Sequence, residues 1–354
     1  MQIEENKPLA PFTTFGIGGP ARWYVEAASE DKVFEAVVWA QQHSVPLFLL
    51  SGGSNLLVSD AGFPGLVLRA SLKGIRTVDD GHNRVYEAAS GEDWDQFVQR
   101  TVDDGCAGIE CLAGIPGTVG GTPVQNVGAY GQEVSSAIAS VRALDLQAGV
   151  FRQFNKAECG FGYRKSRFNT VDRGRYIVTR VSFRLSPGGA PEIKYTELKW
   201  ALDAVTPTGV QPTLAATAAA VRRLRQNKGM LIVEGDPDCK SAGSFFKNPV
   251  MTATQAAEIA AKCGKEPPKF PAGADGEPSD LVKLPAAWLI EQAGFTKGYR
   301  LGAAGISSRH TLALVNLGGA TAKEILALAA RITETVEARF GIHLEREPVL
   351  VGFD

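Results

Sequence analysis

The sequence predicts a mixed α+β protein built from two or three domains. Its 354 residues exceed what one hydrophobic core normally serves, and 44% of them are hydrophobic, which is enough to fill several cores. Helix and strand patterns alternate along the whole chain. The stretch SPGGAPEIKY (186–195) interrupts them and is followed by helical patterns. The first half is therefore expected to be mixed α+β, and the second half a separate α/β unit.

The elements of the first half follow from periodicity and end signals. Ser29 is a plausible N-cap for a helix over 30–43, because Val33, Phe34, Val37 and Val38 share one helical face. The apolar run VPLFLL (45–50) predicts a strand that leads into the glycine turn SGGSN. A second amphipathic helix (91–104, closed by Gly105) and two strands complete this half, at 141–146 and 176–185.

The second half is expected to be helical at three places. A long helix over 214–228 marks a new domain near residue 210. Capping boxes open two further helices, at Thr252 with Gln255 and at Thr321 with Glu324, and Gly341 closes the last one. The segment 264–280 is rich in proline, glycine and charge, and it is expected to be a surface loop.

Composition excludes several classes of function. The formal net charge is −1, so no overall field favours nucleic acid or an anionic membrane. The N-terminus lacks a basic region before an apolar core, and no run approaches 18 apolar residues, so we expect a cytoplasmic protein without signal peptide or membrane span.

The five cysteines show no CxxC spacing. Cys106 and Cys111 are expected to be structural thiols, with a redox or metal pair as the alternative.

Glycine is concentrated in one stretch, GIPGTVGGTPVQNVGAYG (114–131), which holds six glycines in 18 positions. Such clusters are kept where backbone adopts positive φ or touches a ligand closely. Together with SGGSN (51–55), this stretch can form anion-binding concavities without a lysine, and the hydroxyls of Ser54, Thr118 and Thr122 add donors for a pyrophosphate. Gln125, Asn126 and Tyr130 add groups that recognise rings, so a dinucleotide cofactor is expected. A pair of tight turns is the alternative for SGGSN.

Other nucleotide and metal motifs are missing from the sequence. It contains no GxxxxGK[ST], no strand-borne GxGxxG and no HExxH, and none of its four histidines lies beside a glycine loop. No metal site is expected. Two further motifs carry reactive groups: GYRKSRFN (162–169) gathers three cations in a turn, unless it is simply a solvated surface run, and SAGSFFKNP (241–249) presents Ser244 on a rigid support.

Seven motifs spread in order over nearly the whole chain resemble those of the UDP-N-acetylenolpyruvoylglucosamine reductase (MurB) family. They are PFTTFGIGGPA (11–21), SGGSNLLV (51–58), the glycine stretch 114–131, GYRKSRFN, SAGSFFKNP, WLIEQAGFTKG (288–298) and HLEREPVLVGF (343–353). The resemblance implies a two-lobed FAD-binding fold of the vanillyl-alcohol-oxidase (PCMH) type, with lobes at 1–72 and 73–210. It also implies a C-terminal α/β MurB substrate-binding domain at 211–354, whose last residues return to the active site.

The same resemblance implies the reaction and its cofactors. NADPH reduces noncovalently bound FAD, and the flavin reduces UDP-N-acetylglucosamine enolpyruvate to UDP-N-acetylmuramate for peptidoglycan synthesis. The hydride goes to the methylene carbon, and a proton goes to the adjacent carbon. The expected partner is this small-molecule substrate, without nucleic acid or membrane, and the enzyme is expected to be a monomer. The alternatives are a sugar or alcohol oxidase on the same FAD fold and a nonenzymatic nucleotide-binding module.

The resemblance also implies the site residues. Arg164 and Glu347 polarise the substrate carboxylate and stabilise the intermediate, and Ser244 donates the proton. FAD is expected to contact Gly52, Gly53, Ser54, Asn55, Ile115, Pro116, Gly117, Gly120, Gly121, Thr122, Gln125, Asn126, Gly128 and Ala129. Substrate is expected to contact Tyr130, Tyr195, Lys228, Asn248 and Gln292.

Three features depart from the family pattern or leave a choice open. Glu347 precedes Pro348 and Val349 where many members have Val-Arg, and Glu345 is a rival glutamate, although the register of the closing VLVGF favours Glu347. Tyr195 resembles the tyrosine of a branch with an extra loop over the UDP pyrophosphate, with a buried core tyrosine as the alternative. The segments 229–239 and 264–280 are longer than in shorter members, and the first of them directly follows Lys228.

Overall fold

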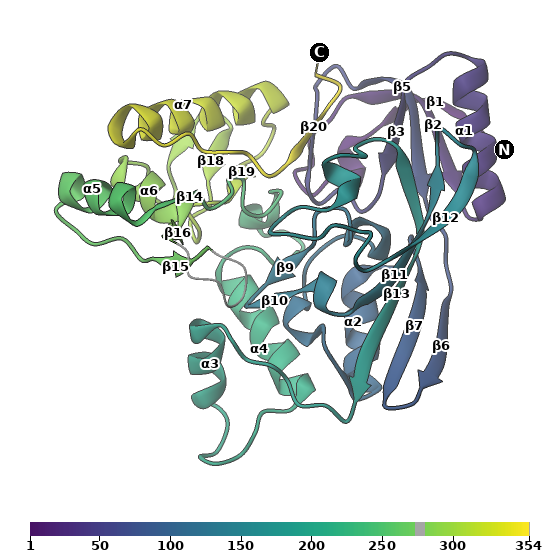
Figure 1. The fold of residues 1–354 in the computed structure, drawn as a ribbon. Helices are drawn as coiled ribbons and strands as arrows, with labels where there is room; N and C mark the ends of the chain where they lie inside the picture. The colour runs from purple at the N-terminus through teal and green to yellow at the C-terminus, as the bar shows by residue number, and fades with distance from the viewer. Residues whose placement is uncertain (273–279, 354) are drawn as a thin grey trace. The chain divides into compact units, whose positions relative to one another are not determined.

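The computed structural model describes residues 1–272 and 280–353, so part of the expected surface loop 264–280 lies outside the described residues. The chain forms two compact units (Figure 1). Unit 1 contains residues 1–7, 21–53 and 63–227, and unit 2 contains residues 8–20, 54–62 and 228–354. Each unit thus draws on both early and later parts of the sequence.

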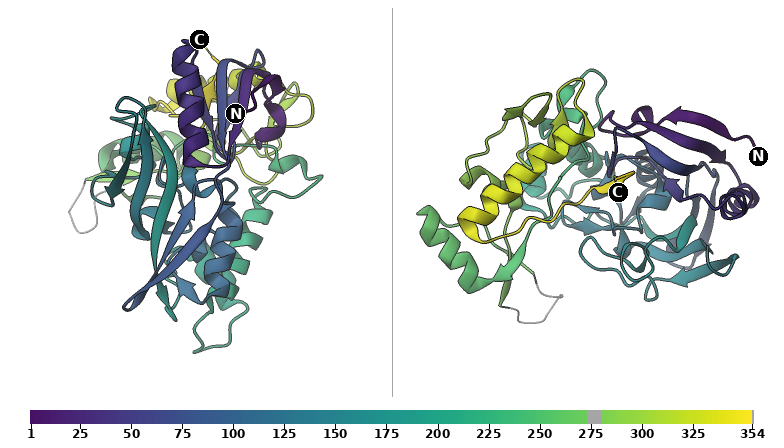
Figure 2. Two further views of the ribbon diagram at one scale, coloured as in Figure 1. Left: turned by 90° about the vertical axis from the view of Figure 1, so that its right-hand side faces the viewer. Right: turned by 90° about the horizontal axis from the view of Figure 1, so that it is seen from above.

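Unit 1 begins with a four-stranded sheet in the order β1-β2-β5-β3. Both β2 and β3 run parallel to β5, and helix α1 packs on this sheet (Figure 2). Val33 and Val37 of α1 are buried in this core together with Leu66 and Leu68 of β5. The elements are β1 (Glu4–Pro8), β2 (Pro20–Ala27), α1 (Glu30–Gln42), β3 (Leu47–Leu50) and β5 (Phe63–Ala70).

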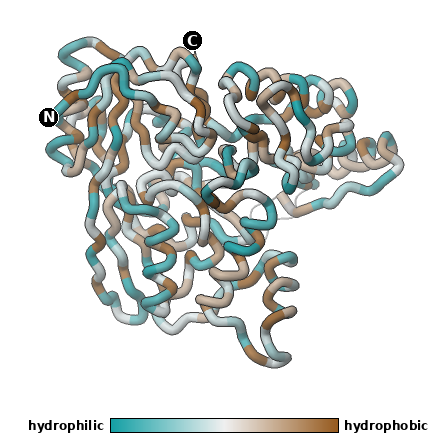
Figure 3. The backbone as a smooth tube through the Cα atoms, turned by 180° about the vertical axis from the view of Figure 1, so that it is seen from behind, coloured by the Kyte–Doolittle hydropathy of each residue, from teal (hydrophilic) through white to brown (hydrophobic). Residues whose placement is uncertain are grey.

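A second, antiparallel sheet of unit 1 has the order β12-β11-β13-β7-β6, and β8 also pairs with β13. From Arg180 onward, buried residues of its central strand β13 alternate with more exposed ones, as a strand with one face on a core requires. Figure 3 shows short apolar and polar stretches that follow one another along the backbone. The strands are β6 (Ile75–Asp80), β7 (Asn83–Ala89), β8 (Cys106–Ala107), β11 (Ile138–Asp145), β12 (Val150–Asn155) and β13 (Tyr176–Pro187), and a small hairpin pairs β9 (Gly128–Ala129) with β10 (Gln132–Glu133).

Three helices complete unit 1, namely α2 (Trp94–Asp103), α3 (Thr196–Asp203) and α4 (Leu214–Asn227). The sequence predicted that the helix over 214–228 opens a new domain near residue 210. The structure instead groups α4 with unit 1, because α4 packs on α2 and α3 and buries Ala218 and Val221 in the core below the antiparallel sheet. The change of unit falls after Asn227.

In its described residues, unit 2 combines small sheets with three α-helices around one core. One sheet has the order β14-β16-β15 and a second has the order β17-β18-β19, while β20 pairs in parallel with β4. The elements are β4 (Leu56–Val58), β14 (Val250–Thr252), α5 (Ala253–Cys263), β15 (Phe270–Pro271), β16 (Leu281–Lys283), α6 (Ala286–Gln292), β17 (Arg300–Leu301), β18 (Ala304–Ile306), β19 (Leu314–Asn316), α7 (Ala322–Phe340) and β20 (Val349–Val351). The last strand of the chain therefore returns to the segment that follows the 51–55 loop.

Most of the predicted helix ends are confirmed. The helix expected over 91–104 instead begins at Trp94, because Asp93 caps it, and it ends at Asp103. Ser29 caps α1, and both capping boxes form, at Thr252 with Gln255 and at Thr321 with Glu324. Gly341 ends α7 in the left-handed conformation. One predicted core position is wrong: Phe34 is 39% exposed, because α1 buries Ala36 and Ala40 beside Val33 and Val37. None of the helices in the described part of the chain is long and apolar enough to cross a lipid bilayer.

Candidate active site

The two predicted glycine loops meet in unit 1. A side chain at Gly52 would overlap the backbone of Gly117, so only glycine allows this approach. The hydroxyls of Ser51 and Thr118 hydrogen-bond to each other across the same junction. The structure therefore brings 51–53 and the first part of the 114–131 stretch together as one backbone-lined surface.

A buried serine that the sequence reasoning missed lies beside this surface. Ser90 is 3% exposed, and its Oγ has no hydrogen-bond partner among the described residues. A Cβ at Gly120 would stand 2.5 Å from the Ser90 Cβ, and Gly120 N donates to Ser90 O at 2.9 Å. A buried hydroxyl without a hydrogen-bond partner lowers the stability of the fold, unless a ligand or a water molecule supplies that partner. This donor, beside glycine backbone, fits a phosphate-containing cofactor.

Arg164 sits on a tight hairpin of unit 1. Gly162 and Lys165 exchange two backbone hydrogen bonds, of 2.9 and 3.0 Å, around it. Its φ is 55°, a left-handed value that is uncommon for a residue other than glycine. Its Nη2 donates to Gly128 O at 2.8 Å, so the guanidinium lies against the β9–β10 hairpin. The alternative of a merely solvated cationic run does not describe Arg164, which is half-buried and donates to the backbone of the 114–131 stretch.

The β9–β10 hairpin of unit 1 carries Tyr130, one of the predicted substrate contacts, between its two strands. The ring of Tyr195 meets the ring of Tyr130 edge-on at 5.4 Å, and Tyr195 is the N-cap of α3. Tyr195 is 37% exposed, so it is not a core tyrosine. Burial raises the pKa of Tyr130 to about 12, which keeps its hydroxyl protonated near neutral pH. Two of the predicted substrate contacts are thus brought together.

Arg225 is a second residue that the sequence reasoning missed. It is buried near the end of α4, where its Nε donates to Gly114 O at 2.9 Å. Its positive charge acts to lower the pKa of Tyr130, against the larger effect of burial. A signal was available, because Arg225 stands four residues after the buried Val221 and so occupies a core-facing helical position. A cation at such a position needs a specific partner.

In unit 2, the segments of Ser244 and Glu347 run side by side. Ser244 forms a bridge with Ala313, and the next residue, Phe245, accepts a hydrogen bond from Glu347 N at 2.8 Å. Phe245 and Phe246 are buried, so they anchor Ser244 as predicted. Ser244 and Glu347 are therefore neighbours on adjacent backbone segments.

The surroundings of the two candidate glutamates differ. Glu345 is exposed and pairs with Lys247 Nζ at 3.2 Å. Glu347 is half-buried, and its carbonyl accepts a hydrogen bond from Asn55 Nδ2 at 3.3 Å. Asn55 O in turn accepts from Val349 N at 2.9 Å, at the start of the β4–β20 pairing. Asn55, predicted to contact the cofactor, thus also fixes the backbone of Glu347.

The remaining predicted substrate residues lie in unit 2, with Gln292 at the end of α6, Asn248 in the loop before β14 and Lys228 in a turn. Asn248 Oδ1 accepts from Ala286 N at 2.9 Å and so closes the first turn of α6, while Gln292 ends α6. Lys228 directly precedes Gly229, which has a φ of 64° and packs against Asp238. Asp238 binds the backbone and hydroxyl of Ser308, at 2.8 and 2.6 Å. The long segment 229–239 is thereby held against the segment around Ser308, within unit 2.

Two predicted cofactor residues use their side chains within the protein. The Thr122 hydroxyl donates to Val119 O at 2.8 Å. The Asn126 amide is 1% exposed and bonds to three protein groups. Which of the predicted residues contact FAD, either directly or through backbone, stays a prediction.

Comparison with protein families matches both halves of the chain. Residues 21–154 match the family described as FAD binding domain. Residues 236–351 match the family described as UDP-N-acetylenolpyruvoylglucosamine reductase, C-terminal domain.

Full-length relatives carry the same description. The UDP-N-acetylenolpyruvoylglucosamine reductase of Streptomyces coelicolor is 46% identical, over 99% of this chain and 91% of its own. That of Pseudomonas fluorescens is 41% identical, over 99% of both chains. Among solved structures, the UDP-N-acetylenolpyruvylglucosamine reductase (MurB) of Thermus caldophilus matches 99% of both chains with a TM-score of 0.67 and 28% identity.

Proposed function

The chain belongs to the UDP-N-acetylenolpyruvoylglucosamine reductase family, and from this premise we propose which of its residues carry the reaction. It is an FAD-dependent, NADPH-oxidising reductase that converts UDP-N-acetylglucosamine enolpyruvate to UDP-N-acetylmuramate in peptidoglycan precursor synthesis. The predicted fold class, a two-lobed FAD-binding fold with a MurB C-terminal domain, is confirmed. The alternative of a sugar or alcohol oxidase is not favoured.

We propose that the joined glycine loops of unit 1 hold FAD noncovalently. Gly52 lets the two loops meet, since a side chain there would overlap Gly117, and the Oγ of the buried Ser90 has no hydrogen-bond partner among the described residues. When bound, FAD passes a hydride from NADPH to the enolpyruvyl double bond. The segments 51–53 and 114–131 contain no histidine to which flavin could be tethered.

The observation that carries the assignment of catalytic residues is the pairing of the Ser244 and Glu347 segments. An enol ether is electron-rich, so it accepts hydride only when its conjugated carboxylate is polarised by nearby cations or acids. We assign this task to Arg164 and Glu347. The guanidinium supplies a planar fork of donors for the carboxylate, and its Nη2 donates to Gly128 O, which fixes the orientation of the fork.

Ser244 supplies the proton that completes the reduction. Hydride arrival at the methylene carbon leaves negative charge on the neighbouring carbon, next to the carboxylate. A serine hydroxyl is a weak acid, so it works here only when it is held still beside that carbon. The bridge to Ala313 and the buried Phe245 and Phe246 hold the Ser244 backbone in this way.

Stopped-flow measurement of the two half-reactions tests this assignment. Ser244→Ala is expected to slow flavin reoxidation by the substrate by about 10²–10⁴-fold, while NADPH still reduces the flavin at a near-normal rate. Ser244→Cys should retain more activity than the alanine variant, because a thiol also donates a proton. The matched control is Ser241→Ala, which removes a hydroxyl that accepts from Gly243 N in the same loop. Equal loss in both half-reactions would show that the substitution only disturbs the pocket.

We also propose that the enzyme acts as a monomer in the cytoplasm, where a reaction that consumes NADPH and a nucleotide sugar has both reactants. Sedimentation velocity of the flavin-loaded protein tests the first statement. A mass near 37.6 kDa is expected for the monomer.

A further inference from the structure

Left-handed backbone is concentrated around Arg164. Among the described residues, five other than glycine have positive φ, namely Asn6, Ser44, Asn126, Tyr130 and Arg164. The last three belong to two segments of unit 1 that touch each other through Arg164 Nη2 and Gly128 O. Such conformations persist only where the surrounding contacts hold them, and they gather at functional sites. The contacts that hold Arg164 in place are therefore of interest.

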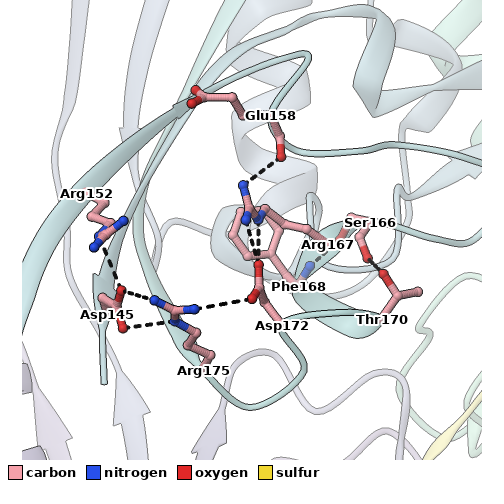
Figure 4. A network of polar contacts seen from close by, with 9 residues as sticks. All are labelled: Asp145, Arg152, Glu158, Ser166, Arg167, Phe168, Thr170, Asp172 and Arg175. Atoms are coloured by element: carbon pink, nitrogen blue, oxygen red, sulfur yellow. Dashed lines mark hydrogen bonds and ion pairs between the residues drawn. The ribbon is translucent and has the colours of Figure 1, made fainter. Parts of the chain in front are cut away.

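The hairpin 162–165 is held from its own C-terminal side by Asn169. Asn169 Nδ2 donates to Arg164 O at 3.1 Å, and Asn169 Oδ1 accepts from Ser166 N at 2.9 Å. Ion pairs hold the segment 167–175, which follows the hairpin (Figure 4). Arg167 pairs with Asp172, and Arg175 pairs with both Asp172 and Asp145. These contacts fix where the loop leaves the hairpin.

Asn126 holds the other side of the hairpin. Its Nδ2 donates to Gly162 O at 3.0 Å and to Glu133 Oε2 at 2.8 Å, and its Oδ1 accepts from Ser135 N at 3.1 Å. Gly162 O also accepts from Lys165 N, so Asn126 bonds to the carbonyl that closes the Arg164 turn. Two residues after Asn126, Gly128 O accepts the Arg164 guanidinium itself. The short segment 126–128 therefore holds the Arg164 turn at two points. Asn126 binds the carbonyl of Gly162, and Gly128 O binds the Arg164 guanidinium.

We propose that Asn126 is a positioning residue of the reaction, which acts through Arg164 by fixing its hairpin rather than by contacting FAD or substrate with its side chain. This inference rests on the role proposed above for Arg164. A buried amide is suited to this task because it donates twice and accepts once without adding charge. Displacing a catalytic group by about 1 Å costs on the order of 10²-fold in rate.

Two substitutions separate positioning from folding. Asn126→Asp keeps the shape but replaces the N–H donors by an oxygen that repels Glu133 Oε2 and Gly162 O, and Asn126→Gly removes the side chain while allowing the φ of 47°. Both variants are expected to bind FAD and to be reduced by NADPH at near-normal rates, but to be reoxidised by substrate roughly 10²-fold more slowly. The control is Val98→Ala, a cavity in the buried core of α2 that lowers the melting temperature without contacting the hairpin. Its reoxidation rate should stay near that of the unmodified enzyme.

A double-mutant cycle with Arg164→Lys decides whether Asn126 acts through Arg164. If it does, adding Asn126→Gly, which introduces no new charge, to Arg164→Lys slows reoxidation little further, because the positioned fork is already gone. Multiplicative effects of the two substitutions, or normal reoxidation in both Asn126 variants, would overturn the inference while leaving Arg164 in its role. Normal reoxidation in Arg164→Lys alone is a different result, which would overturn the proposed role of Arg164 and the inference with it.

Discussion

Glu345 and Glu347 show how two identical side chains, two positions apart, are given different environments. Glu345 is exposed and pairs with Lys247, whereas Glu347 is half-buried with its backbone bonded to Phe245 and Asn55. Glu347→Gln is expected to lower the rate of flavin reoxidation by about 10²–10³-fold, because it removes a group that stabilises developing charge. Glu345→Gln breaks only an exposed ion pair, and its rate should stay within a factor of two of the unmodified enzyme. Comparable losses in the two variants, measured by stopped flow, would contradict the assignment.

At the residue scale, the sequence predicted the site residues that stand in motifs and missed those that depend on folding. Ser244 and Arg164 are visible because their neighbours are unusual in type and spacing. Ser90 is a common residue in an ordinary stretch, and only the structure shows that its Oγ has no partner among the described residues. The helical position of Arg225, four residues after Val221, indicated a core-facing side chain, and the structure shows that it is buried. The three contacts of Asn126 join residues up to 36 positions apart, which no local pattern encodes.

At the element scale, the turn between β11 and β12 is held by a buried carboxylate. Asp145 binds Arg175 through both oxygens, at 3.1 and 2.9 Å, and accepts from Gln147 N and Ala148 N. Hydrogen bonds from Arg175 hold the pKa of Asp145 well below its ordinary value. The unfolded chain, with an ordinary pKa of about 3.9, therefore takes up the proton first, and stability is lost as the pH falls below about 5.

Thermal unfolding between pH 7 and pH 3 tests this role of Asp145. Asp145→Asn is expected to lower the melting temperature at pH 7 by a few degrees and to weaken its fall at acid pH. The control is Asp79→Asn, because Asp79 pairs with Arg84 on the surface and such a pair adds little. A melting curve of Asp145→Asn that follows the unmodified protein at every pH would contradict the prediction.

Element types and ends were predictable where the signal is local. The caps at Ser29, Thr252 and Thr321 are formed by residues three positions apart, so the sequence alone indicates them. The misplacement of Phe34 has a tertiary cause, since the face of α1 that is buried is chosen by the sheet on which it packs. The unit to which α4 belongs is likewise decided by packing partners and not by the helix pattern itself.

At the scale of the whole molecule, the chain is interleaved between its two units. Unit 2 takes residues 8–20 and 54–62 from the N-terminal part, and the family match to the C-terminal domain, at 236–351, contains neither. The sequence suggested consecutive domains because composition and periodicity describe neighbours along the chain. Burial of Phe15, Ile17 and Leu57 among residues beyond 240 is a long-range property.

This interleaving predicts that residues 228–354 do not fold by themselves. The fragment lacks Phe15, which is fully buried and contacts the Phe245 ring edge-on at 6.4 Å, and it lacks Leu57 of β4, the strand that pairs with β20. Removing one such buried side chain costs about 2–5 kcal/mol, and the fragment loses several of them together with a strand pairing. It is expected to show no cooperative thermal transition by circular dichroism, while Phe15→Ala in the full chain should fold but lose about 3–5 kcal/mol of stability. A fragment that melts cooperatively near the temperature of the full chain would contradict this prediction, because it would show that unit 2 folds without residues 8–20 and 54–62. The pairing of the Ser244 and Glu347 segments would then be maintained by residues 228–354 alone.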